Sequence, residues 1–146
     1  MQDYGQRKYK ETEVTTADRG RLVVLLYDGA INFLKNAKQS IQEGNLDGKC
    51  NNINRAQDIV QELEFSLNMK EGGEIAKNLV SLYRFMYTHL VRAKISRDGT
   101  QQMDEVISML SSLNEAWREV ITRPEVQEIR QAEQSPYTGL SRGINV

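Results

Sequence analysis

Residues 25–34 read LLYDGAINFL, and this stretch decides the fold. Its large side chains recur three or four positions apart rather than two, which is typical of one face of an α-helix. The spacing continues on both sides, so we expect a helix from Asp18, as its N-cap, to about Glu43. Gly44 and Asn45 then end it. The apolar stripe of this helix consists of Val23, Tyr27, Ala30, Leu34, Ala37 and Ile41.

Three further stretches carry the same pattern. They predict helices over about 46–68, 74–95 and 98–121. The glycine pair at 72 and 73 is expected to separate the second helix from the third, and Asp98 to Gln101 resembles a capping box at the start of the fourth. The three stripes are Cys50, Ile53, Ala56, Val60, Leu63 and Leu67; Ala76, Leu79, Tyr83, Met86, Leu90 and Ala93; and Met103, Val106, Leu110, Leu113, Trp117 and Val120.

Helices of this length joined by short links run antiparallel to their neighbours. The predicted fold is therefore all-α, an antiparallel up-down-up-down four-helix bundle over residues 17–121. Residues 1–16 are predicted to form a flexible N-terminal segment, loose or docked on a groove. Residues 122–146 are predicted to form a flexible C-terminal extension, with a short helix that uses Val126 and Ile129 before a disordered tail.

Charge and composition limit the classes of partner. Nineteen Lys and Arg residues oppose twenty Asp and Glu residues, so no bulk charge favours nucleic acid or an anionic membrane surface. No stretch approaches the roughly 20 apolar residues of a membrane span, and the N-terminus lacks the apolar run of a signal peptide. The single cysteine, Cys50, excludes an intramolecular disulfide and suits a reducing compartment. We expect a cytoplasmic protein without membrane insertion.

Few residues could carry catalysis or hold a cofactor. The single histidine, His89, has an aromatic and a basic helical neighbour rather than acids, so no metal site is predicted. Cys50 is interpreted as a buried, inert thiol. Asp28 falls on a solvated stripe, and Gly29 on a flank where we expect a neighbouring segment to approach closely. An enzyme built on acids alone would need inward carboxylate pairs, which the stripes lack. We predict neither enzyme activity nor a cofactor.

Two phenylalanines lie on the wrong side of their helices for a simple core. At 100° per residue, Phe65 falls among polar residues and Phe85 falls opposite Tyr83. Further apolar residues of the third helix, including Val80 and Tyr87, widen its apolar surface beyond one seam. Scattered surface apolar groups are normal, so one reading is a plain structural surface. The other is an apolar groove for an amphipathic partner segment. A structural bundle that self-associates through this surface is the alternative function.

Two motifs make the sequence similar to a known family. TTADRGRLVVLLYDGAINFLKNAKQSI at 15–41 resembles the first helix of the FliS family of flagellar export chaperones. AQDIVQELEFSLNMKEGGEIAKNLVSLYRFM at 56–86 and LNEAWREVI at 113–121 continue the match. The joint presence of LYDGAI and GGEIAKNL makes the resemblance specific. It covers roughly residues 9 to 121, with Asp18 and Arg19 standing where the family usually has Ser-Pro.

The resemblance implies a function that the residues alone do not name. It implies a cytoplasmic chaperone that binds the disordered C-terminal region of flagellin, prevents premature polymerisation and supports export, with the flagellar type III export apparatus as a further partner. It also implies that Tyr9 and Val14 can lie in a hydrophobic groove that flagellin shares. Nothing carries over to residues 122–146. Our candidate partner-binding residues are Tyr9, Val14, Phe65, Val80, Phe85 and Tyr87.

Overall fold

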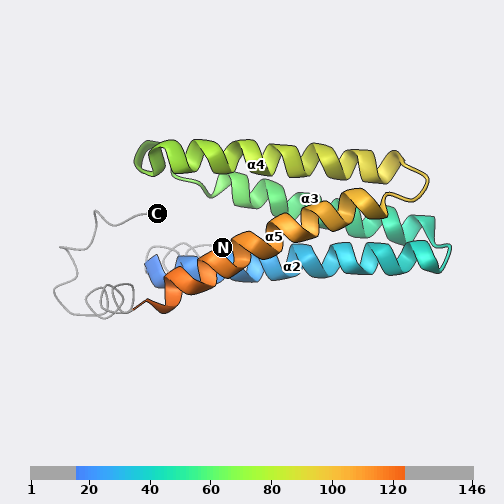
Figure 1. Cartoon of the computed structure of the whole chain (residues 1–146), viewed down its shortest axis with the longest axis horizontal. Coiled ribbons are helices and arrows are strands. Elements are labelled where there is room, and N and C mark those ends of the chain that lie inside the picture. Colours follow the sequence, from blue (N-terminus) through green and yellow to red (C-terminus); the bar gives the residue numbers. More distant parts are fainter. Residues whose placement is uncertain (1–15, 124–146) are drawn as a thin grey trace, which may run out of the picture.

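The computed structural model describes residues 16–123, with side chains from Arg19 onward. This part of the chain forms α2 (Thr16–Gln42), α3 (Leu46–Phe65), α4 (Met69–Ile95) and α5 (Thr100–Thr122). The helix α2 packs against α3 and α5, and α4 packs against the same two helices. Figure 1 shows all four along one long axis, with α5 running obliquely to the others. The predicted all-α, antiparallel four-helix bundle is confirmed.

The core consists mainly of the predicted apolar stripes, and Val24 and Ile31 of α2 are buried beside them. Burial of each large apolar side chain contributes about 1.5–3 kcal/mol, so the stripes supply most of the free energy that holds the helices together. Toward the helix ends the stripes are less covered, since Val23, Ile41 and Leu67 are only partly buried and Val120 is exposed. The buried members are Tyr27, Ala30, Leu34, Ala37, Ile53, Ala56, Val60, Leu63, Ala76, Tyr83, Met86, Leu90, Ala93, Met103, Val106 and Leu110.

Three predicted helix boundaries are wrong by a few residues. Helix α2 begins at Thr16, so Asp18 lies inside the helix and is not its N-cap. Helix α3 ends at Phe65 rather than at Asn68, because the Asn68 side chain instead accepts hydrogen bonds from two backbone N–H groups in the first turn of α4. The break expected before Glu74 occurs at Gly73 (φ 56°, ψ −134°), inside α4 and after one helical turn. The glycine therefore kinks α4 instead of preceding it.

The link into α5 uses a different turn from the predicted capping box. The Asp98 carboxylate accepts hydrogen bonds from the side chain and the backbone N–H of Thr100, the latter at 3.0 Å. These bonds hold the pKa of Asp98 below its ordinary value. Gln101 does not bond back to Asp98, because its amide donates to Glu105. A Cβ at Gly99 (φ +82°) would lie 2.4 Å from the Ala93 carbonyl oxygen, so this turn requires glycine.

Some polar side chains are buried where the stripes place none. The Lys49 ammonium donates to the Ser96 carbonyl at 2.8 Å, and the Gln57 amide donates to the Tyr87 carbonyl at 3.1 Å. Both bonds tie α3 to α4. The prediction that Cys50 is buried is wrong: its side chain is only half-buried, because the neighbouring Lys49 takes the fully buried place at the start of α3.

Candidate functional site

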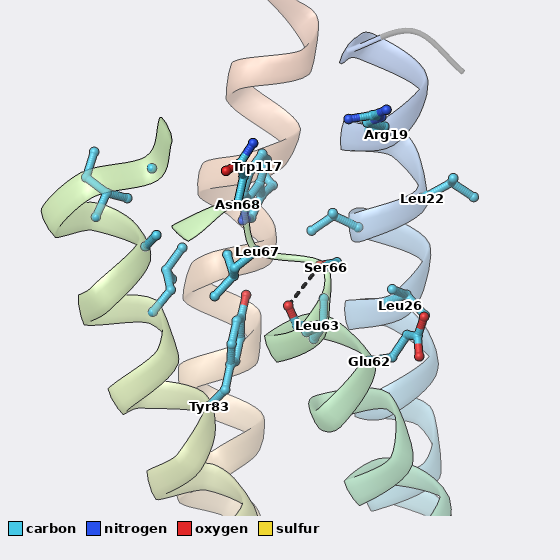
Figure 2. Close-up of a pocket in the computed structure, with 15 residues that line it drawn as sticks. Arg19, Leu22, Leu26, Glu62, Leu63, Ser66, Leu67, Asn68, Tyr83 and Trp117 are labelled. Atoms are coloured by element: carbon cyan, nitrogen blue, oxygen red, sulfur yellow. Dashed lines mark hydrogen bonds between the residues drawn. The ribbon is translucent and has the colours of Figure 1, made fainter. Parts of the chain in front are cut away.

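An apolar pocket of about 420 Å³ opens at the end of the bundle where α2 begins and α3 and α5 end. We call it the end pocket (Figure 2). Polar residues, among them Arg19, Glu62 and Asn68, also line it. The apolar lining comes from all four helices and from the link between α3 and α4, and consists of Leu22, Val23, Leu26, Leu63, Leu67, Ile75, Ala76, Leu79 and Trp117, together with the ring of Tyr83.

The rim of the end pocket exposes large apolar side chains. Leu22 is 53% exposed on α2, and Ile75 is 72% exposed on α4. Gly72 and Ala76, two small residues on the same stretch of α4, also line the pocket. Large apolar side chains exposed around an apolar pocket are typical of a protein-binding site.

Hydrogen-bonded aromatic side chains lie next to the end pocket. The hydroxyls of Tyr27 and Tyr83 are 2.5 Å apart, and the Trp117 indole N–H donates to the Tyr27 oxygen at 3.1 Å. Burial raises the pKa of both tyrosines above the ordinary value of 10.0. In Figure 2 the Tyr83 hydroxyl points toward Leu67, on the wall of the pocket.

A second cavity, of about 300 Å³, lies between α3 and α4. We call it the side groove. Phe65, which is 73% exposed, and Tyr87 line it, and an ion pair between Arg84 Nε and Glu64 Oε1 at 3.3 Å joins its two helices. Tyr83 lines both the side groove and the end pocket, so one aromatic ring borders both cavities.

The polar groups singled out in the sequence serve helix packing. Asp28, predicted on a solvated stripe, is 38% exposed and also accepts a hydrogen bond from the Asn114 amide and one from Arg118, each at 2.7 Å. His89 Nε2 lies 2.5 Å from Glu105 Oε2 on α5. Among residues 16–123, no group of three or more His, Cys, Asp and Glu side chains could hold a metal ion. Nor does any helix in that range have the length and apolar character to cross a membrane.

Comparison with known proteins now identifies the family. The family model for flagellar protein FliS matches residues 1–124. The chain belongs to the FliS family. It is 34% identical over 113 residues to the flagellar secretion chaperone FliS of Bacillus subtilis, covering 77% of this chain and 83% of that protein. It is 33% identical over 123 residues to the FliS of Vibrio cholerae, covering 84% and 88%, and 33% identical over 121 residues to that of Salmonella typhimurium, covering 82% and 89%.

The resemblance drawn from LYDGAI and GGEIAKNL is thereby confirmed. FliS is a family of flagellar secretion chaperones and not of enzymes, so the prediction that the chain is not an enzyme is also confirmed. The bundle described above is the FliS scaffold in this chain, and the end pocket and the side groove open on its surface.

The structure brings together only some of the candidate binding residues. Phe65 and Tyr87 meet in the side groove. Phe85, 49% exposed as its helical position predicts, stacks on His89 with ring centroids 5.0 Å apart, and so faces α5 rather than α3. Val80 is partly buried and lines neither cavity. Tyr9 and Val14 lie outside the described residues.

Sequence reasoning missed the end pocket. Its lining residues on α2 include Leu22 and Leu26, which share a flank with Gly29 and Phe33 beside the main stripe. That second apolar flank was the available signal. It was not recognised as a site because the opposing wall, from Leu67 after the end of α3 and from Ile75 near the start of α4, lies where the helix boundaries were predicted wrongly.

Proposed function

We propose that this FliS family member binds the disordered C-terminal region of flagellin in the cytoplasm, prevents its premature polymerisation and supports its export through the flagellar export apparatus. Relatives named flagellar secretion chaperones support a client in flagellar export. The observation that carries the proposal is the open end pocket, together with the exposed apolar side chains at its rim, Leu22 and Ile75.

The energetics favour an extended contact. When a disordered segment folds on a partner, its ordering costs about 2–5 kcal/mol of binding free energy. Burial of one large apolar side chain contributes about 1.5–3 kcal/mol. Several apolar side chains must therefore be covered at once. The end pocket and the side groove share Tyr83, which lets one segment place side chains in both. A segment held in this way cannot pack against other flagellin subunits.

Calorimetric titration of the full chain with a flagellin C-terminal segment tests the proposal. Ile75→Ser, at the rim of the end pocket, is expected to weaken binding about tenfold, because one large apolar contact is lost. Ile95→Ser is the matched control: Ile95 is 80% exposed at the opposite end of the same helix and lines neither cavity, so its affinity should equal that of the wild type.

The titration and a sedimentation experiment together distinguish a chaperone from a bundle that self-associates. No heat of binding with the wild-type chain would overturn the proposal. Sedimentation at increasing concentration, without flagellin and then with it, would reveal a homo-oligomer held by the same surface. For a chaperone we expect a defined complex with the segment. The Ile75→Ser variant should need about tenfold more segment to form that complex, and Ile95→Ser should need no more than the wild type.

A further inference from the structure

The aromatic cluster beside the end pocket contains one more donor hydrogen than its hydrogen bonds use. Tyr27, Tyr83 and Trp117 bring two O–H groups and one N–H group. They make two bonds, from Trp117 Nε1 to the Tyr27 oxygen at 3.1 Å and between the two hydroxyls at 2.5 Å. Within residues 16–123 neither hydroxyl makes another hydrogen bond. One hydroxyl hydrogen is therefore left without an acceptor.

Both tyrosines are fully buried, at 0% exposed for Tyr27 and 1% for Tyr83, so the lining of the end pocket decides which of them an outside acceptor can reach. If Tyr83 donates to Tyr27, the spare hydrogen belongs to Tyr27, which is fully buried and lines neither cavity, so no outside acceptor reaches it. A buried donor without a partner costs its full desolvation. If Tyr27 donates instead, its oxygen still accepts from Trp117, and the spare hydrogen lies on Tyr83. Tyr83 lines the end pocket, so an acceptor that enters the pocket satisfies the whole cluster.

We infer that the Tyr83 hydroxyl donates a hydrogen bond to a backbone carbonyl of the segment that fills the end pocket. The inference rests on the proposed function and assigns a specificity-determining residue to it. Two neighbouring donors are already used, since the Ser66 hydroxyl donates to the Leu63 carbonyl at 2.8 Å and the Trp117 N–H donates to the Tyr27 oxygen. The spare donor of Tyr83 thus adds one directional contact to a lining that is otherwise mostly apolar.

This geometry defines the chemistry of the bound segment. Carbonyls inside a helix already accept from the N–H four residues later, whereas the last four carbonyls of a helix are free. The acceptor therefore comes from the final turn of a helix or from non-helical backbone. Apolar side chains on both sides of that carbonyl fill the space between Leu22, Leu26 and Leu79.

Tyr83→Phe tests the inference, because it removes the donor and keeps the ring that borders both cavities. Titration with the flagellin C-terminal segment should give an affinity about 3- to 10-fold below wild type, the usual effect of one hydrogen bond. Tyr27→Phe is the matched control: it removes the other hydroxyl and leaves the Tyr83 donor, so the affinity should change less than twofold. Both titrations are performed well below the unfolding midpoint of each variant.

A second readout separates recognition from a purely structural role. In chains labelled with ¹³C at tyrosine Cζ, addition of the segment should shift the Tyr83 resonance in the wild type and in Tyr27→Phe. Equal affinities of wild type and Tyr83→Phe, or equal losses in the two variants, would overturn the inference and leave the proposed function standing. Failure of the wild-type chain to bind the segment overturns both.

Discussion

The hydroxyl oxygens of Tyr27 and Tyr83 lie 2.5 Å apart, although α2 and α4 are not adjacent helices in the bundle. The helix α2 packs against α3 and α5, and α4 does the same, so this bond crosses the diagonal of the bundle. Trp117 adds α5 to the contact by donating to the Tyr27 oxygen. Three helices are therefore joined at the base of the end pocket through polar atoms that must stay neutral and hydrogen-bonded.

The buried tyrosines predict loss of stability at alkaline pH. Burial raises the pKa of Tyr27 and Tyr83 above 10.0, so the folded chain keeps both hydroxyl protons at a pH where the unfolded chain releases them. Their contribution to the free energy of unfolding is fully present below pH 10 and falls as the pH rises above it. The fall should approach about 1.4 kcal/mol per pH unit for each tyrosine.

Urea unfolding at pH 9, 10 and 11 measures this dependence. Tyr83→Phe serves as the control, since it removes one of the two titrating groups and should reduce the slope above pH 10 by about half. Identical slopes in the two chains would mean that the tyrosine pair does not cause the alkaline loss.

The Asp28 carboxylate joins α2 to α5 through two hydrogen bonds that contribute differently to stability. Its ion pair with Arg118 is largely exposed and contributes about 0–1 kcal/mol. Asp28 also accepts a hydrogen bond from the amide of Asn114, which is buried. A buried amide that loses its acceptor costs about 1–3 kcal/mol.

We expect Asp28→Ala to lower the free energy of unfolding by about 1–3 kcal/mol. Asp28→Asn keeps an acceptor oxygen for Asn114 and should cost less than 1 kcal/mol. Urea titration at neutral pH compares them, and equal losses would contradict this division.

The sequence predicted the bundle because one apolar stripe on each helix is sufficient to define which face is buried. Tyr27, Leu34, Leu90 and Leu110 lie in the core as their spacing requires. The burial of Lys49 could not be predicted, because the pattern of side-chain types places lysines at the surface. The pattern does not show that the long lysine side chain allows its ammonium to reach the Ser96 carbonyl at the end of α4.

The candidate site was predicted less completely than the fold. Helical angle alone correctly placed Phe65 and Phe85 outside the core. It could not show that α4 separates them, since that depends on which helices flank α4 on each side. The end pocket was missed for a related reason. A pocket is formed by residues from several helices, such as Leu22 and Ile75, whose juxtaposition depends on where each helix begins and ends.

Two glycines of α2 are expected to respond differently to alanine. A Cβ at Gly20 would lie 2.3 Å from Ile121 Cγ2 of α5, so overpacking by about 1–3 kcal/mol should outweigh the gain in helix propensity of about 1 kcal/mol. A Cβ at Gly29 would lie 3.3 Å from Ile59 Cδ1 of α3, which confirms the expected close approach and needs only a small shift. Thermal unfolding should therefore rank Gly29→Ala at or above the wild type and Gly20→Ala below it. The reverse order would contradict these contacts.

The separation of Phe65 from Phe85 predicts which side of α4 receives flagellin. Both side chains are exposed, so Phe65→Ser and Phe85→Ser should each change the free energy of unfolding by less than about 0.5 kcal/mol. Phe65 lies in the side groove, which shares Tyr83 with the end pocket, whereas Phe85 lies against His89 on the α5 side. A segment confined to the end pocket and the side groove should lose about tenfold in affinity with Phe65→Ser and little with Phe85→Ser.

Calorimetry with the two single variants and the double variant measures this difference. If the segment wraps around α4, both single variants lose affinity and the double variant loses the product of the two, because contacts on opposite sides of a helix are independent. Unchanged affinity in the double variant would exclude both phenylalanines from the binding surface. Binding would then depend on the end pocket, with Leu22 and Ile75 as its outer contacts.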